Sequence, residues 1–382
     1  MKKTVYSENS ILIIGQTPPP YHGSTIMTRT YLKALSSCGY EVLFINKLFS
    51  RNISDIGKLT WQKIMALTML IFRVIKTCTV CKPILCIYFM SSAGSSLIID
   101  LFVLQLLDLF SVNFIPRFGG KGFKDLAKKP FWEYLLRNTL KKSLGGIVLG
   151  NKQKNDVNMF IKNESLYILP NCLLEDSEYT CLNCDDKILR ILFLSNLIPS
   201  KGSMEFLQAA RIALAALPNR QMQFIIAGNK WTDEFNEKLK SYVLENKMQE
   251  FVTFYDDVYG KEKEKLFATS HIFVFPTYYE LETFGIVNLE AMRAGLPVIS
   301  SPEEAIPDVV KNGETGFIVH PKDPNEISDR IIKLIEDSLL RRRMGIKGRE
   351  RFLEEYSFEP FVKSLEMAVN FFVSGLEKQS KH

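Results

Sequence analysis

The sequence predicts an α/β protein with two doubly wound parallel sheets. Twelve short apolar runs alternate with segments long enough for helices along the 382 residues. The runs are rich in Val, Ile, Leu and Phe without strict alternation, which is typical of parallel strands buried on both faces. Because twelve strands are too many for one ordinary domain of this kind, we expect two domains, with a seam in the polar segment Glu175–Lys187.

Six strands are expected in each half of the chain. Those of the first half are Ile11–Gly15, Glu41–Ile45, Ile84–Met90, Val112–Ile115, Ile147–Leu149 and Tyr167–Leu169. Those of the second half are Ile188–Leu194, Gln223–Ala227, Val252–Tyr255, Ile272–Phe275, Val298–Ser300 and Phe317–Val319. Right-handed βαβ units place ligands beyond the C-terminal ends of such strands, so site residues are expected directly after these runs.

Charge is spread unevenly along the chain. Residues 1–180 hold 22 Lys and Arg against 12 Asp and Glu, and the totals of 48 and 42 leave 26 against 30 for the remainder. The basic first half favours an anionic partner such as a phospholipid surface or a lipid-diphosphate acceptor. Nucleic acid is disfavoured, because no zinc-finger, homeodomain or RNP pattern occurs.

A cytoplasmic location is expected. The run Ile11–Ile14 is too short for a signal peptide, and the longest apolar region, Ile84–Ile115, is broken by polar residues before it reaches the roughly 20 residues of a membrane span. The basic and apolar stretch Trp61–Lys82 suits a peripheral helix on the inner face of an anionic membrane. An ordinary helix with one core face explains that stretch equally well.

Two Cys-x-x-Cys spacings, Cys78/Cys81 and Cys181/Cys184, are compatible with zinc. The pairs lie far apart, in an expected helix and in the polar seam. Reduced thiols are therefore the favoured interpretation, and no metal site is predicted.

The most informative stretch runs from Tyr279 to Ile299. Glu282 follows an expected strand, and Glu290 lies in a helix that opens near Gly285. A strand–loop–helix unit presents backbone N–H groups and the positive end of a helix dipole to an anion. Carboxylates beside an anion site can bind vicinal hydroxyl groups, because an ionised carboxylate accepts hydrogen bonds from O–H groups. A sugar linked through phosphates, with diols on both sides, fits this pattern.

The stretch resembles the sugar-nucleotide motif of family-four retaining glycosyltransferases, the group 1 glycosyl transferases, which have the GT-B fold. The family pattern is Glu-Gly-Phe-Gly, four variable residues, Glu-Ala-Met and Gly-x-Pro-Val, and Thr283 departs from it. The resemblance implies that Glu290 holds the ribose diol and that Glu282 holds sugar hydroxyls. The donor-binding backbone N–H groups would be those of Thr283, Phe284, Gly285 and Ile286. The alternative is that both glutamates are solvated surface charges.

Other donor-binding residues follow from the same resemblance. Lys201, at the opening of a helix, would neutralise the diphosphate, and Asn196 stands where the family has Arg. Gly23, in the loop after the first strand, would allow close backbone approach to the donor phosphates. Gly228 and Val258 follow strands that the family places around the base.

Arg117 ends an expected strand of the first half, where the family commonly has a His that contacts the sugar. Arg117 would substitute for it. The glycines within residues 119–122 also suit a phosphate, although Walker spacing is missing. Because no Asp-x-Asp pair occurs, Lys201, helix N-termini and loop amides would stabilise the leaving diphosphate, and neither a metal nor a cofactor is expected.

The resemblance implies two Rossmann-like domains facing across a cleft. Residues 1–174 plus 358–382 would form the acceptor-side domain with a C-terminal crossover helix, and residues 175–357 the nucleotide-sugar-binding domain. The catalytic residues would be Glu282, Lys201 and Arg117.

The expected activity is that of a retaining, metal-independent hexosyltransferase of surface polysaccharide biosynthesis, such as O-antigen, capsule or exopolysaccharide. A UDP-sugar or similar nucleotide sugar would be the donor, and a glycan or polyprenyl-diphosphate-linked compound the acceptor. A nucleotide-sugar epimerase on the same fold and a catalytically silent membrane-associated scaffold are the alternatives. The donor sugar, base, acceptor, linkage and oligomeric state stay open.

Overall fold

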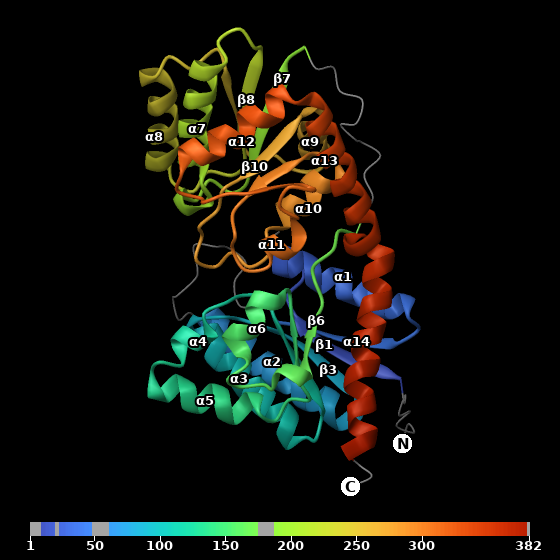
Figure 1. Cartoon of the computed structure of the whole chain (residues 1–382). Coiled ribbons are helices and arrows are strands. Elements are labelled where there is room, and N and C mark those ends of the chain that lie inside the picture. Colours follow the sequence, from blue (N-terminus) through green and yellow to red (C-terminus); the bar gives the residue numbers. More distant parts are fainter. Residues whose placement is uncertain (1–8, 20–22, 48–60, 175–186, 380–382) are drawn as a thin grey trace. The chain divides into compact units, whose positions relative to one another are not determined.

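The computed structural model describes residues 9–19, 23–47, 61–174 and 187–379 (Figure 1). The chain forms two compact units: Met1–Cys172 with Phe358–His382, and Leu173–Ser357. Each unit contains one six-stranded parallel sheet flanked by helices, which confirms the predicted α/β class. Of the predicted seam, only Lys187 is described.

The first sheet has the strand order β2-β1-β3-β4-β5-β6. Its interior strands are buried along their whole length, which explains why they read as continuous apolar runs. The strands are β1 (Ser10–Gly15), β2 (Glu41–Asn46), β3 (Leu85–Met90), β4 (Phe114–Phe118), β5 (Gly146–Val148) and β6 (Leu166–Ile168).

Two groups of helices flank the first sheet. The helices α1 (Gly23–Ser37) and α14 (Phe358–Gln379) pack against each other, with the rings of Tyr31 and Phe361 edge-on at 5.3 Å. In the second group α3 packs against both α2 and α5. The helices not yet given bounds are α2 (Trp61–Val80), α3 (Gly94–Leu109), α4 (Phe123–Leu126), α5 (Pro130–Leu140), α6 (Asn151–Val157) and η2 (Asn163–Ser165).

Membrane spans and metal clusters are both missing from the described residues. No helix there combines the length and the apolar character that crossing a bilayer requires. No grouping of His, Cys, Asp and Glu in the same ranges could hold a metal ion. Cys78 is buried in α2, and Cys181 and Cys184 lie outside the described residues.

The second sheet has the order β12-β11-β10-β7-β8-β9. Together the two sheets confirm all twelve predicted runs as parallel strands. They are β7 (Leu189–Leu194), β8 (Met222–Ala227), β9 (Val252–Tyr255), β10 (Ile272–Phe275), β11 (Val298–Ser300) and β12 (Gly316–Ile318).

Helices connect these strands and extend beyond the last of them. They are η3 (Pro199–Lys201), α7 (Ser203–Ala216), α8 (Asp233–Glu245), α9 (Gly260–Thr269), α10 (Ile286–Arg293), α11 (Ile306–Val309), α12 (Pro324–Glu336), α13 (Ser338–Arg351) and the π-helical turn η4 (Phe352–Tyr356). Helix α12 is capped by Asp323, whose carboxylate accepts from two N–H groups of its first turn.

The connections of the second sheet reverse direction between β7 and β10. From β7 the chain builds β8 and β9 toward one edge, and β10, β11 and β12 then extend toward the other. Strands β7 and β10 are nevertheless paired neighbours, so their C-terminal ends diverge into connections on opposite sides. Open α/β sheets bind ligands at such a switch point. The residues that follow β7 and β10 therefore form the candidate site.

Candidate functional site

The loops after β7 and β10 lie in direct contact. Gly202, in the left-handed region at φ +92°, joins η3 to α7, and a Cβ atom there would lie 2.4 Å from the carbonyl oxygen of Pro276. Only glycine allows this approach without displacing backbone. The N–H of Tyr278 also donates to the carbonyl of Ser200, at 2.8 Å. These contacts fix Lys201, which precedes Gly202, beside the loop that carries Glu282.

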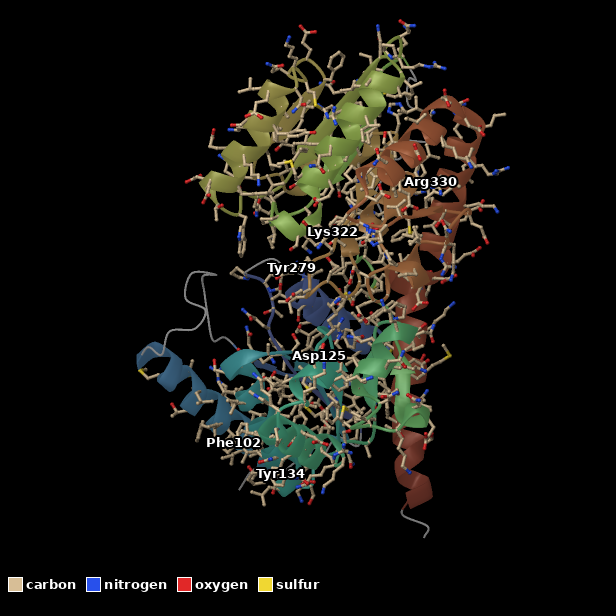
Figure 2. The ribbon with its side chains drawn as sticks, turned by 60° about the vertical axis from the view of Figure 1, so that its left-hand side comes forward. Phe102, Asp125, Tyr134, Tyr279, Lys322 and Arg330 are labelled. Carbon is tan, nitrogen blue, oxygen red and sulfur yellow. The ribbon has the colours of Figure 1, made fainter. Side chains whose placement is uncertain are left out.

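Lys201 and Glu282 form an ion pair. Lys201 Nζ lies 2.5 Å from Glu282 Oε2, and the two side chains are only 13% and 12% exposed. The ammonium group also lies 4.6 Å from the ring centre of Tyr279, a residue labelled in Figure 2. These contacts orient both side chains at the end of the sheet.

The second oxygen of Glu282 binds the head of α10. Glu282 Oε1 accepts from the N–H groups of Gly285 at 2.9 Å and Phe284 at 3.4 Å. Burial acts to raise the pKa of Glu282, but Lys201 and these two N–H groups outweigh it and lower the pKa from its ordinary value of 4.5. Glu282 is thus ionised at neutral pH, and its contacts hold it in place.

Of the four backbone N–H groups predicted to bind the donor, those of Phe284 and Gly285 donate to Glu282. The carbonyl of Thr283 accepts from Ala305 N–H at 3.0 Å, and Phe284 is buried. Helix α10 begins at Ile286, so its first N–H groups are those of Ile286 and Val287. These have no acceptor within the helix. Val287 was not predicted, because the motif places the glycine but not the start of the helix.

Glu290 is held by a lysine that the sequence did not single out. Lys263 Nζ, from α9, lies 2.6 Å from Glu290 Oε1. The other oxygen, Oε2, is buried and has no hydrogen-bond partner within the described residues. One oxygen is anchored and the other can accept. The sequence did not predict the contact between Lys263 and Glu290. Helix α9 contains several Lys and Glu residues, and their spacing does not indicate which of them reaches Glu290.

The other residues of the second unit that were predicted to bind the nucleotide-sugar donor lie just after β7, β8 and β9. Gly228, at φ +139°, places a hypothetical Cβ 1.9 Å from Ser195 O, so the end of β8 lies tightly against the segment after β7. Asn196 is exposed there. Val258 is 5% exposed, so its side chain packs inside the unit. Their roles toward a donor stay predictions.

Arg117 and Gly23 belong to the first unit. Gly23 begins α1. Arg117 is 2% exposed, donates to Asn171 Oδ1 at 2.5 Å and lies 5.2 Å from the ring centre of Phe89. Burial lowers the pKa of its guanidinium. This placement favours a structural role and does not support the predicted contact with a sugar.

The backbone N–H groups of the glycine-rich segment after β4 are bonded to a side chain of the protein. The carboxylate of Asp156 accepts from the N–H groups of Gly122 at 2.8 Å, Phe123 at 3.2 Å and Lys124 at 2.8 Å. These are the N–H groups at the start of α4 that an anion would use. The suggestion that this segment suits a phosphate is therefore wrong, because an acidic side chain fills the place.

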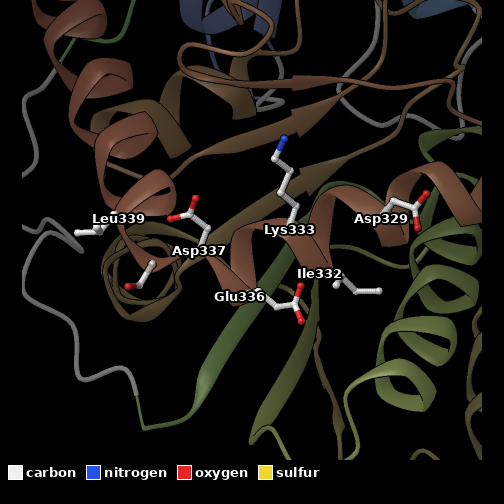
Figure 3. Close-up of a pocket in the computed structure, with 7 residues that line it drawn as sticks. Asp329, Ile332, Lys333, Glu336, Asp337 and Leu339 are labelled. Carbon is white, nitrogen blue, oxygen red and sulfur yellow. The ribbon is translucent and has the colours of Figure 1, made fainter.

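A surface hollow of about 550 Å³ lies elsewhere in the second unit, where α12 meets α13 (Figure 3). Its charged lining consists of Asp329, Lys333, Glu336 and Asp337. Asp337 caps α13 by accepting from Leu340 N–H. Since carboxylates outnumber the single ammonium group, the hollow is unsuited to phosphates. The candidate site stays at the ends of β7 and β10.

Comparison with known proteins finds a family match within the second unit. Residues 182–351 match the family described as glycosyl transferases group 1. The capsular polysaccharide biosynthesis glycosyltransferase CapM of Staphylococcus aureus is 29% identical over 217 residues, which cover 55% of this chain and 52% of that protein. The chain spans about half the length of the curated relatives it matches.

Solved structures share the fold over nearly the whole chain. Sucrose-phosphate synthase from Thermosynechococcus elongatus gives a TM-score of 0.73 at 19% identity, covering 95% of this chain and 98% of that one. Anabaena HepE, in complex with UDP and glucose, gives 0.69 at 13% identity, with coverages of 95% and 100%. These likenesses confirm the predicted GT-B fold class, two Rossmann-like α/β domains.

Proposed function

We propose that this chain, whose residues 182–351 match the glycosyl transferases group 1 family, is a retaining glycosyltransferase. It moves a sugar from a nucleotide-diphosphate donor to a hydroxyl of a glycan or lipid-linked acceptor in surface polysaccharide biosynthesis. The ion pair between Lys201 and Glu282 at the switch point of the second sheet carries the proposal. The likeness to CapM and to a structure that holds UDP and glucose supports it.

The donor diphosphate lies against Lys201 and the start of α10. An incoming diphosphate replaces Glu282 as the partner of the Lys201 ammonium group, which lies at hydrogen-bonding distance from that carboxylate. The N–H groups of Ile286 and Val287 and the positive end of the α10 dipole add donors without a charged side chain. This supports a diphosphate site that needs no second cation at Asn196.

The two glutamates hold hydroxyl groups on either side of the diphosphate. Glu282, oriented by the N–H groups of Gly285 and Phe284, accepts from hydroxyls of the transferred sugar. Glu290, anchored through Oε1 by Lys263, accepts from the ribose through Oε2. A buried acceptor without a partner is costly unless a ligand satisfies it, which supports this assignment.

Transfer occurs on one face of the sugar. The bond between the anomeric carbon and the diphosphate oxygen breaks while the acceptor oxygen bonds to the same carbon, which is oxocarbenium-like. The departing diphosphate oxygen takes the acceptor proton, so the step requires no nucleophile from the protein. Lys201 and the α10 N–H groups stabilise the charge that develops on the diphosphate. We expect the reaction to proceed without a divalent metal.

A donor screen tests the proposal. Purified protein is incubated with UDP-, GDP- and ADP-sugars and with glycan or polyprenyl-diphosphate acceptors, and release of the nucleoside diphosphate is measured with and without a chelator. Acceptor-dependent release with retained anomeric configuration by NMR is expected. Isomerised donor sugar in the absence of acceptor would instead indicate an epimerase. Failure of every nucleoside diphosphate to bind in calorimetry would overturn the proposal.

A further inference from the structure

Three adjoining helices of the first unit expose large apolar side chains to solvent. Phe72 is 67% exposed on α2, Leu109 is 74% exposed on α3 and Tyr134 is 68% exposed on α5. The whole set, which we call the α2–α3–α5 face, consists of Met65, Met69, Phe72, Ile98, Phe102, Leu109, Phe131 and Tyr134. This is a concentration of exposed hydrophobic groups that an isolated soluble surface does not need.

These side chains form continuous stripes on neighbouring helices. Met65, Met69 and Phe72 follow the i, i+4, i+7 spacing, so they lie along one side of α2. Helix α3 packs against both α2 and α5, and Figure 2 labels Phe102 of α3 and Tyr134 of α5 in this part of the first unit. The core side of the same helices carries a separate buried set that includes Leu70, Val74, Leu101 and Leu104. The exposed stripes are therefore additional to the core packing.

The charges around this face are predominantly positive. Helix α2 contains no Asp or Glu, and Arg73 and Lys76 are exposed beside its apolar stripe. The acidic side chains of α3 and α5 are already paired with cations: Asp100 with Lys47 at 2.9 Å, Asp108 with Lys142 at 2.5 Å and Glu133 with Arg137 at 3.0 Å. A partner therefore meets apolar groups with two exposed cations, Arg73 and Lys76, beside those of α2.

This combination indicates an anionic bilayer surface as the partner. A second copy of the chain, docked face to face, would bring together two surfaces that both carry Arg73 and Lys76 and whose acidic side chains are already paired, which is repulsive. Aromatic and Met side chains can enter the acyl boundary of a bilayer while Lys and Arg contact phosphates. Charge complementarity thus separates a lipid surface from a symmetric dimer.

We propose that the α2–α3–α5 face binds the surface of an anionic phospholipid membrane. The apolar stripes of α2 and α3 enter the boundary between headgroups and acyl chains. Arg73 and Lys76 lie at the phosphate level, and Tyr134 places its ring in the same zone. The proposal extends the sequence prediction from one amphipathic stretch to a three-helix surface. It does not depend on glycosyl transfer.

Vesicle flotation tests the proposal with a matched pair of variants. Full-length protein is mixed with vesicles of phosphatidylethanolamine and phosphatidylglycerol, or of phosphatidylcholine alone. Met69→Glu changes a methionine that is 51% exposed on the proposed face, and Met367→Glu changes one that is 56% exposed on α14. Wild type and Met367→Glu are expected to float with the anionic vesicles, and Met69→Glu to lose at least tenfold in partitioning. Should Met69→Glu fold poorly by circular dichroism, Phe102→Gln replaces it.

Charge variants complete the experiment. Arg73→Gln and Lys76→Gln are each expected to weaken binding to anionic vesicles about fivefold, equivalent to about 1 kcal/mol per cation. Nucleoside diphosphate binding, measured by calorimetry on the same variants, should be unchanged, so failure of the membrane surface is distinguishable from failure of the transferase proposal. The proposal is overturned if wild type does not float, if Met367→Glu loses as much as Met69→Glu, or if light scattering shows a dimer that Met69→Glu dissociates.

Discussion

Lys201 and Glu282 lie 81 positions apart in the sequence and form an ion pair at the ends of two adjacent strands. The family resemblance assigns them to different parts of a donor, the diphosphate and the sugar. Each is the other's counter-ion, so neither charge is left buried and unpaired. Donor binding therefore involves an exchange of partners, and the two residues should be energetically coupled.

Replacing Lys201 with Met should abolish most of the donor affinity. The substitution removes the cation that would meet the diphosphate and leaves the Glu282 carboxylate beside the incoming anion. Loss of such a charged contact costs about 2–5 kcal/mol. Isothermal titration calorimetry with the nucleoside diphosphate identified in the donor screen measures the effect.

Lys240→Met provides the control for that variant. Lys240 forms an exposed pair with Glu237 on α8, at 3.7 Å, and such pairs contribute little. Its donor affinity should equal that of wild type. Equal affinities of Lys201→Met and Lys240→Met would show that Lys201 does not contact the diphosphate.

The stability of the second unit should depend on the ionisation of Glu282. Its pKa is lower in the folded protein than the ordinary 4.5, so the folded state favours the carboxylate. The associated stability is fully present above the unfolded-state pKa and is lost as pH falls through the folded-state pKa. Urea unfolding of wild type and Glu282→Gln should thus differ at pH 7, and the difference should shrink as the pH is lowered below 4.5. A difference that grows in acid would contradict this sign.

The sequence was sufficient to predict all twelve strands because parallel strands buried on both faces leave continuous apolar runs. It also placed Glu282, Lys201 and residues 283–286 near one another, since all follow strands of one sheet. It did not show that β7 and β10 are neighbours at a switch point, because strand order is a long-range property. Without that adjacency the ion pair could not be predicted.

Other contacts left no signal in the sequence. Arg117 stands where the family pattern has a His, but its burial against Phe89 and Asn171 depends on how distant segments pack. Asp156 lies 34 positions from the glycine whose N–H it accepts. Motifs specify backbone conformation and residue type, whereas the partners of buried charges are set by tertiary packing.

Glu290 should contribute to nucleoside recognition but not to diphosphate recognition. Glu290→Gln keeps the shape of the side chain and weakens its capacity to accept from ribose hydroxyls through Oε2. Affinity for the nucleoside diphosphate should fall about tenfold, whereas affinity for inorganic pyrophosphate should be unchanged. Lys201→Met should weaken both ligands. Competition calorimetry with the two ligands separates these outcomes, and a parallel loss of both in Glu290→Gln would argue against a ribose contact.

Gly202 should be far less tolerant of a side chain than another glycine with a similar backbone conformation. In Gly202→Ala the new methyl group would lie 2.4 Å from the Pro276 carbonyl, whereas Gly313, at φ +80°, has no atom within 4 Å of such a group. Both variants carry the strain of positive φ, about 1–3 kcal/mol. Only Gly202→Ala must also displace the loop after β10, at a further cost of about 1–3 kcal/mol. Thermal unfolding compares the two, and equal melting temperatures would show that the loops are not in contact.

Arg117 should act on the stability of the first unit rather than on the chemical step. Arg117→Met removes the donor to Asn171 Oδ1 and leaves that buried oxygen unpaired, at a cost of about 1–3 kcal/mol. Removing both partners, in Arg117→Met with Asn171→Leu, should cost less than the sum of the single variants, because no orphaned polar group then remains. Denaturant unfolding of the four proteins gives this coupling. A fall in kcat for Arg117→Met with unchanged stability would restore the predicted contact with the sugar.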